Sequence, residues 1–144
     1  IHFECHWMHK DVVKDFKKMF EKIGVKTIIK LGLETFDYDF RESVLVKGID
    51  EKEPEKIAKY FDEINLLQGI KGQTKVSMIN DIDIGLEYFS RVCVNIMVEN
   101  GMPVKPDRNV IEEFMKDVYP KYKDNERVDI LIENTDFGVG KNMD

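Results

Sequence analysis

The sequence predicts an α/β fold in which mostly parallel strands form part of a (β/α) barrel. Two observations support this prediction. Five strand-sized apolar runs alternate with segments of helical periodicity, and such alternation is typical of a parallel sheet covered by helices. In three of the runs, one face is aliphatic or aromatic and the other face carries ionisable groups. A barrel with a polar lumen has strands of this kind.

The expected strands are residues 1–7, 25–35, 64–69, 91–98 and 128–134. The expected helices are residues 11–23, 37–46, 54–61, 74–89 and 109–119. Their apolar residues recur three and four positions apart. Gly24 is expected to end the first helix, Pro54 to begin the third and Pro120 to end the last.

Side chains alternate between the two faces of a strand, so the polar residues of each run share a face. They include Lys30 and Glu34 in the second run and Cys93 and Asn95 in the fourth. A buried charge is costly unless it is paired, so repeated polar faces predict a lumen that binds a polar ligand. An antiparallel sheet with its polar face in water is the alternative, which the intervening helices disfavour.

The composition narrows the class of protein. The chain has 144 residues, enough for one domain, and its net charge of −6 argues against a nucleic acid partner. Cys5 and Cys93 lie far apart without a CxxC pair, and no apolar run approaches the ~20 residues of a membrane span. These features predict a cytoplasmic protein that binds a small molecule and neither a membrane nor nucleic acid.

Two segments resemble the radical S-adenosylmethionine (SAM) enzymes. Residues 30–35 (KLGLET), followed by Arg41 and Lys47, resemble the fourth barrel strand and the helix after it. Residues 64–74 (INLLQGIKGQT) resemble the fifth strand and its turn, with Lys71 where the family usually has proline. The resemblance implies a partial radical SAM barrel over residues 1–98, to which residues 99–144 add a helix, a strand and a loop.

The resemblance also implies SAM and a [4Fe–4S] cluster as cofactors, which generate a 5′-deoxyadenosyl radical that abstracts hydrogen from a small-molecule substrate. The sequence contains no CxxxCxxC, the loop whose thiolates hold the cluster, and it begins at Ile1 inside a strand-like run. We therefore expect a single-domain C-terminal fragment without the N-terminal strands, without a metal ligand of its own, and inactive alone. A reductant protein, flavodoxin or ferredoxin, is an expected partner.

Six residues match cofactor-binding positions of the family. Glu34 and Thr35 match positions near the ribose or the amino acid end of SAM. Arg41 or Lys47 matches the basic residue that pairs with the methionyl carboxylate of SAM. Bidentate pairing favours Arg41. Two glycines match the turn that lets the backbone pass close to the adenine: Gly69 and Gly72.

The expected substrate contacts are His2, Glu4, His6, Lys30 and Asn95. Residues 95–98 and 134–140 also resemble, within the family, the queuine lyase-like branch of queuosine salvage, which cleaves a 7-deazaguanine. That resemblance implies that Glu133 and Asp136 accept hydrogen bonds from a guanine-like N–H edge.

Two other functions remain open. His2, Glu4 and His6 suit zinc, iron or manganese, which would make the chain a metal-dependent barrel hydrolase or lyase. A non-enzymatic α/β ligand-binding domain is the second alternative. The first and last strands of the expected fragment have unpaired edges, so we expect the isolated chain to aggregate.

Overall fold

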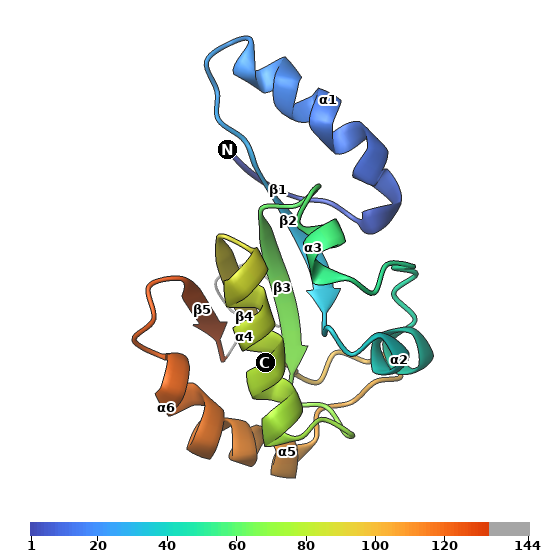
Figure 1. Ribbon diagram of the computed structural model, residues 1–144. Helices are drawn as coiled ribbons and strands as arrows, with labels where there is room; N and C mark the ends of the chain where they lie inside the picture. The colour runs from blue at the N-terminus through green and yellow to red at the C-terminus, as the bar shows by residue number, and fades with distance from the viewer. Residues whose placement is uncertain (133–144) are drawn as a thin grey trace.

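The computed structural model describes residues 1–132, and these contain a five-stranded sheet in which every pairing is parallel. The strands are β1 (His2–Glu4), β2 (Ile28–Glu34), β3 (Glu63–Gln68), β4 (Arg91–Ile96) and β5 (Val128–Leu131). Each strand pairs with its neighbour in sequence, in the order β1-β2-β3-β4-β5 (Figure 1). A doubly wound sheet reverses its order at a switch point. This sheet advances in one direction, so the predicted partial (β/α) barrel is confirmed, as an open arc.

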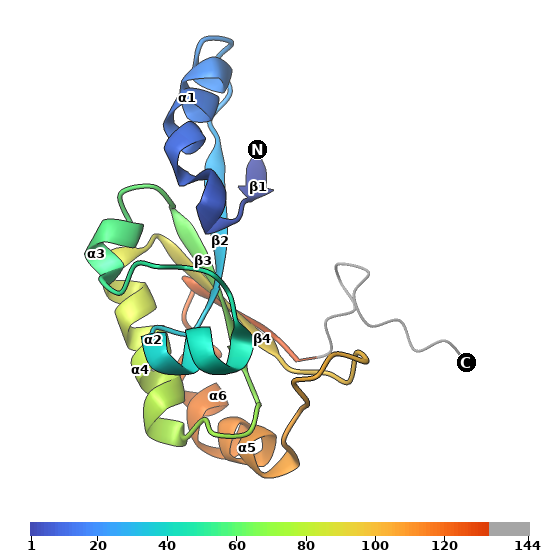
Figure 2. The ribbon, with the colours of Figure 1, turned by 90° about the vertical axis from the view of Figure 1, so that its right-hand side faces the viewer.

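The helices lie in the connections between strands. They are α1 (Lys10–Glu21), α2 (Tyr38–Phe40), α3 (Pro54–Ile57), α4 (Lys75–Tyr88), α5 (Arg108–Glu113) and α6 (Tyr119–Tyr122). A 3-10 turn covers Trp7–His9, and π-helical turns cover Arg41–Leu45 and Phe114–Val118. Figure 2 shows α1, α3 and α4 on the same side of the sheet. No helix within residues 1–132 has the length and apolar character needed to cross a bilayer.

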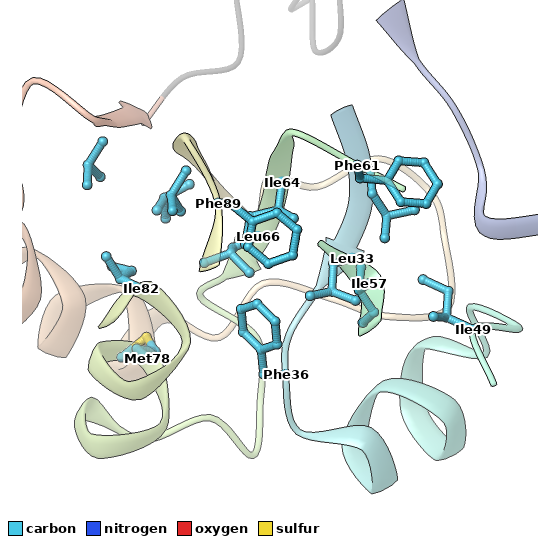
Figure 3. Close-up of a cluster of buried hydrophobic side chains, with 14 of the residues drawn as sticks. Leu33, Phe36, Ile49, Ile57, Phe61, Ile64, Leu66, Met78, Ile82 and Phe89 are labelled. Carbon is cyan, nitrogen blue, oxygen red and sulfur yellow. The ribbon is translucent and has the colours of Figure 1, made fainter. Parts of the chain in front are cut away.

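The hydrophobic core lies between the sheet and α4. Ile64 and Leu66 of β3 project to the side on which Met78 and Ile82 of α4 lie, Leu33 of β2 lies beside Ile57 of α3, and all of these side chains are fully buried (Figure 3). Burying a side chain of this size contributes roughly 1.5–3 kcal/mol. The aliphatic face predicted for the strands therefore faces the helices, which leaves the polar face for the lumen.

Helix α4 is fixed at its start and along its length. Thr74 and Ser77 form a reciprocal capping box at its N-terminus, which satisfies backbone N–H groups that have no partner within the helix. Gly85 faces the sheet, and a Cβ there would lie 2.7 Å from Cγ2 of Val92 and 3.0 Å from Cδ1 of Ile64. Glycine thus lets α4 approach β3 and β4 closely.

Several expected bounds were wrong in detail, and the third helix, for example, ends at Ile57 instead of Phe61. The first strand ends at Glu4 instead of continuing to Trp7, because His6 caps the 3-10 turn that follows. Pro120 does not end the last helix, which continues as α6 to Tyr122. Pro120 lies in the first turn of α6, directly after a π-helical turn, and a proline there removes no necessary hydrogen bond.

Candidate functional site

A cavity of about 330 Å³ opens on the polar face of the sheet. Its polar lining residues are Glu4, Lys30, Glu34, Asn65, Asn95 and Asn100. Four of these were predicted site residues, and period-two alternation brings them together from β1, β2 and β4. In (β/α) barrels, ligands bind at the C-terminal ends of the strands. Glu34 and Asn95 lie near those ends, as that rule requires.

Glu34 has a strained backbone at the end of β2. Its φ is +73°, and the pairing of β2 with β3 shifts register between Gly32 and Glu34. Glu34 and Val46 are the two described non-glycine residues with positive φ. Nζ of Lys47, the residue after Val46, donates to Oε1 of Glu34 at 2.9 Å. Backbone strain of this kind clusters at functional sites. Here the strained residues are Glu34, which accepts from Lys47, and Val46, which precedes Lys47.

Gly32 leaves room for a group of charges above β2. A Cβ on Gly32 would lie 3.4 Å from Oε1 of Glu4, 3.7 Å from Oε1 of Glu34 and 3.8 Å from Nζ of Lys47. The other oxygen of Glu4 accepts a hydrogen bond from Nδ2 of Asn65 at 2.9 Å. Two carboxylates and one ammonium therefore converge above Gly32. Asn65 of β3 holds the carboxylate of Glu4 in place.

A buried acid supports the turn that follows Glu34. Oδ1 of Asp81 accepts the N–H of Phe36 at 2.8 Å, and Thr35 lies beside the same carboxyl. Burial raises the pKa of Asp81 from its ordinary value of 3.8 to about 6, although the hydrogen bonds from Phe36 and Thr35 oppose this rise. Thr35 itself is buried, so the side chain predicted to bind SAM faces the interior, where it holds the chain beside Glu34.

Arg41 is not at the cavity. Its side chain is fully buried, and it donates to the carbonyl oxygens of Thr35, Ile49 and Glu51 at 3.1, 3.1 and 2.7 Å. Its Nε donates to Glu42 at 3.1 Å. These contacts place the guanidinium against the backbone before α2 and in the loop between α2 and α3, away from the cavity. Of the two bases that match the family position, Lys47 is the one beside Glu34.

Charged residues also alternate across the lower part of the lumen. The Cα register aligns Glu4 with Lys30, Lys30 with Glu63 and Glu63 with Arg91. Nζ of Lys30 lies 3.7 Å from the buried carboxylate of Glu63, and Nδ1 of His2 lies 3.6 Å from the same oxygen. His2 thus meets Glu63 beneath the cavity instead of facing it. The ion pair with Lys30 lowers the cost of burying Glu63.

His6 has a structural position. Its Nδ1 accepts the N–H of Met8 at 3.2 Å, so its Nε2 carries the proton and donates to the carbonyl of Lys47 at 2.9 Å. Residues 1–132 contain no group of three or more histidine, cysteine, aspartate or glutamate side chains placed to hold a metal ion. His2, Glu4 and His6 therefore do not converge as the metal-dependent hydrolase alternative requires.

The turn after β3 keeps its shape through glycine and glutamine. Gly69 and Gly72 have φ of +96° and +99°. A Cβ on Gly69 would lie 2.7 Å from Cγ1 of Ile111. Gln73 accepts the N–H groups of Gly69 and Ile70 at 2.9 and 3.1 Å, which closes the turn. The close approach predicted at these glycines is thus made to side chains of the protein itself.

Sequence reasoning missed Asn65 and Asp81. Period-two alternation from Glu63 places Asn65 on the lumen face of β3, so the signal for it was present. Asp81 lay within a helical pattern, and nothing in the sequence distinguished it from a surface acid. Glu133 and Asp136 lie outside the residues that the structure describes.

The singly wound parallel sheet and the polar cavity near its C-terminal strand ends define this chain as part of a (β/α) barrel. No protein-family model and no curated protein sequence matches it. A solved structure does: a queuine lyase from Clostridium spiroforme bound to SAM and queuine, with a TM-score of 0.86 and 36% sequence identity over 96% of this chain. The chain spans 59% of that protein. The resemblance to radical SAM enzymes read from the sequence is thereby confirmed.

Proposed function

We propose that this chain is the C-terminal part of a radical SAM enzyme that cleaves queuine or a similar 7-deazaguanine. The observation that carries the proposal is the strained Glu34, paired with Lys47 at a polar cavity. It occurs in a chain that is 36% identical to a queuine lyase bound to SAM and queuine. Strain beside a charged cavity is expected where a ligand must be held in one orientation.

The charges around Gly32 fit SAM. The cofactor carries a positive sulfonium, a positive ammonium and one carboxylate, so its net charge is opposite to that of the Glu4, Glu34 and Lys47 group. Lys47 would pair with the carboxylate, and Glu34 would accept hydrogen bonds from the ammonium or the ribose hydroxyls. The glycine turn at Gly69 and Gly72 would shape the adenine side. When bound and reduced, the cofactor supplies a 5′-deoxyadenosyl radical that takes hydrogen from the substrate.

The chain's own residues would position the two molecules and exclude water. Its two cysteines are free thiols, Cys5 directly after β1 and Cys93 on β4, so cluster ligands would come from outside this sequence. Flavodoxin or ferredoxin would supply electrons to that cluster.

The test is SAM binding and queuine-dependent formation of 5′-deoxyadenosine by the anaerobically reconstituted full-length protein. Lys47→Met should weaken SAM binding at least about tenfold, because a charge-assisted pair contributes roughly 1.5–3 kcal/mol. Lys56→Met is the matched control, since Lys56 makes a surface pair with Glu53 at 2.8 Å far from the cavity. Its SAM affinity should stay within twofold of the wild type. A wild-type protein that forms no 5′-deoxyadenosine in response to queuine would rule the function out.

A further inference from the structure

The cavity has two chemically different parts. Over β1 and β2 its lining is charged, with Glu4, Lys30 and Glu34. Over β4 its lining is neutral, with Cys93 and Asn95. A charged cofactor and the uncharged ring of a 7-deazaguanine need different surroundings, and the two parts offer them side by side.

Asn95 is the polar centre of the neutral part. In the register of the sheet it lies between Leu67 of β3 and Leu131 of β5, and all three side chains line the cavity. Met97, two residues further along, adds apolar surface. The Asn95 side-chain amide is half-buried and forms no hydrogen bond with any residue of the described part of the chain. An amide in such apolar surroundings is stabilised when a ligand satisfies it.

Two charged residues on the strands that flank the neutral part, Arg91 of β4 and Asp129 of β5, pair with each other. Nη1 of Arg91 donates to both carboxylate oxygens of Asp129 at 2.8 Å, so this pair on β4 and β5 offers little net charge. Burial raises the pKa of the Cys93 thiol, which keeps it uncharged at neutral pH. The neutral part of the cavity therefore favours a ligand group without charge.

We infer that Asn95 binds the substrate through a paired N–H and C=O edge of an uncharged planar heterocycle, with Leu67 and Leu131 as apolar surface on either side of the amide. A side-chain amide carries one donor and one acceptor side by side, and it pairs with nucleobase edges through two hydrogen bonds. This inference rests on the proposed function and assigns the substrate part of the same cavity.

The experiment measures queuine binding by calorimetry to the reconstituted full-length protein saturated with SAM. Asn95→Leu keeps a similar size, suits the apolar neighbours and removes both hydrogen bonds. It should raise the Kd for queuine about 10- to 100-fold, while the Kd for SAM stays within threefold of the wild type. Asn109→Leu is the matched control, because Asn109 is exposed at the start of α5, outside the cavity lining. Thermal melting confirms that both variants are folded.

The outcomes separate this inference from the function on which it rests. If the wild type binds SAM and queuine and Asn95→Leu binds queuine equally well, the function stands and the role of Asn95 is refuted. If Asn95→Leu weakens SAM and queuine equally, the division of the cavity is refuted. A wild type that binds SAM but neither queuine nor guanine refutes the substrate class.

Discussion

Replacing Arg41 with methionine should strongly destabilise the protein. The change removes the donor from three backbone carbonyls, those of Thr35, Ile49 and Glu51, and two of these hydrogen bonds are fully buried. A buried acceptor without a partner costs about 1–3 kcal/mol. Methionine fills most of the space but donates nothing. We therefore expect the free energy of unfolding to fall by about 3–5 kcal/mol, a large share of the ~5–15 kcal/mol of a typical domain.

Urea unfolding of the full-length protein, followed by circular dichroism, measures this loss. Arg108→Met is the matched control, since the Arg108 side chain is 91% exposed and pairs with Glu112 one helical turn away. Its unfolding midpoint should stay close to that of the wild type. If Arg41→Met unfolds at the wild-type midpoint but binds SAM poorly, Arg41 is a cofactor ligand and the structural reasoning is refuted.

Three further predictions follow from the same structure. In urea unfolding, Gly69→Ala should lower the free energy of unfolding by at least ~1 kcal/mol more than Gly24→Ala does. Both positions have positive φ, but only at Gly69 does the added Cβ meet a neighbouring side chain. Equal losses of free energy would contradict this. The raised pKa of Asp81 means that the folded state binds more protons than the unfolded state between pH 3.8 and about 6, so this group's contribution to stability falls as pH rises through that window. Asp81→Asn should therefore gain up to ~3 kcal/mol on the wild type between pH 4 and pH 7, and a difference that is independent of pH would refute the shift. Residues 1–144 expressed alone should aggregate in light scattering, because within residues 1–132 the strands β1 and β5 each pair on one edge only. In addition, α1 and the turn before it expose Met8, Val12 and Met19. A monodisperse monomer would contradict this prediction.

The parts of the fold that depend on local pattern could be predicted from the sequence. Period-two alternation is a property of each strand alone, and it placed Lys30, Glu34 and Asn95 on one face. Helices between successive strands imply parallel pairing, because a parallel connection needs a crossover. The sequential strand order then brings the polar faces into one lumen.

Features that depend on contacts distant in sequence could not be predicted. The hydrogen bond between Glu4 and Asn65 joins residues 61 positions apart and requires the register of three strands. Arg41 could be recognised as structural only once the following loop was known to bring the carbonyls of Ile49 and Glu51 to its guanidinium. A resemblance assigned the same residue to the cofactor, because sequence similarity does not separate a ligand contact from the support beneath it.

That support explains how Glu34 keeps its strained conformation. A non-glycine residue at positive φ costs of order 1–3 kcal/mol, and it persists only where neighbouring contacts determine the backbone. The chain after Glu34 is held from two sides, since Arg41 binds the carbonyl of Thr35 and Asp81 binds the N–H of Phe36. The buried Arg41 and Asp81 thus hold the backbone from which the Glu34 carboxylate pairs with Lys47 at the charged part of the cavity.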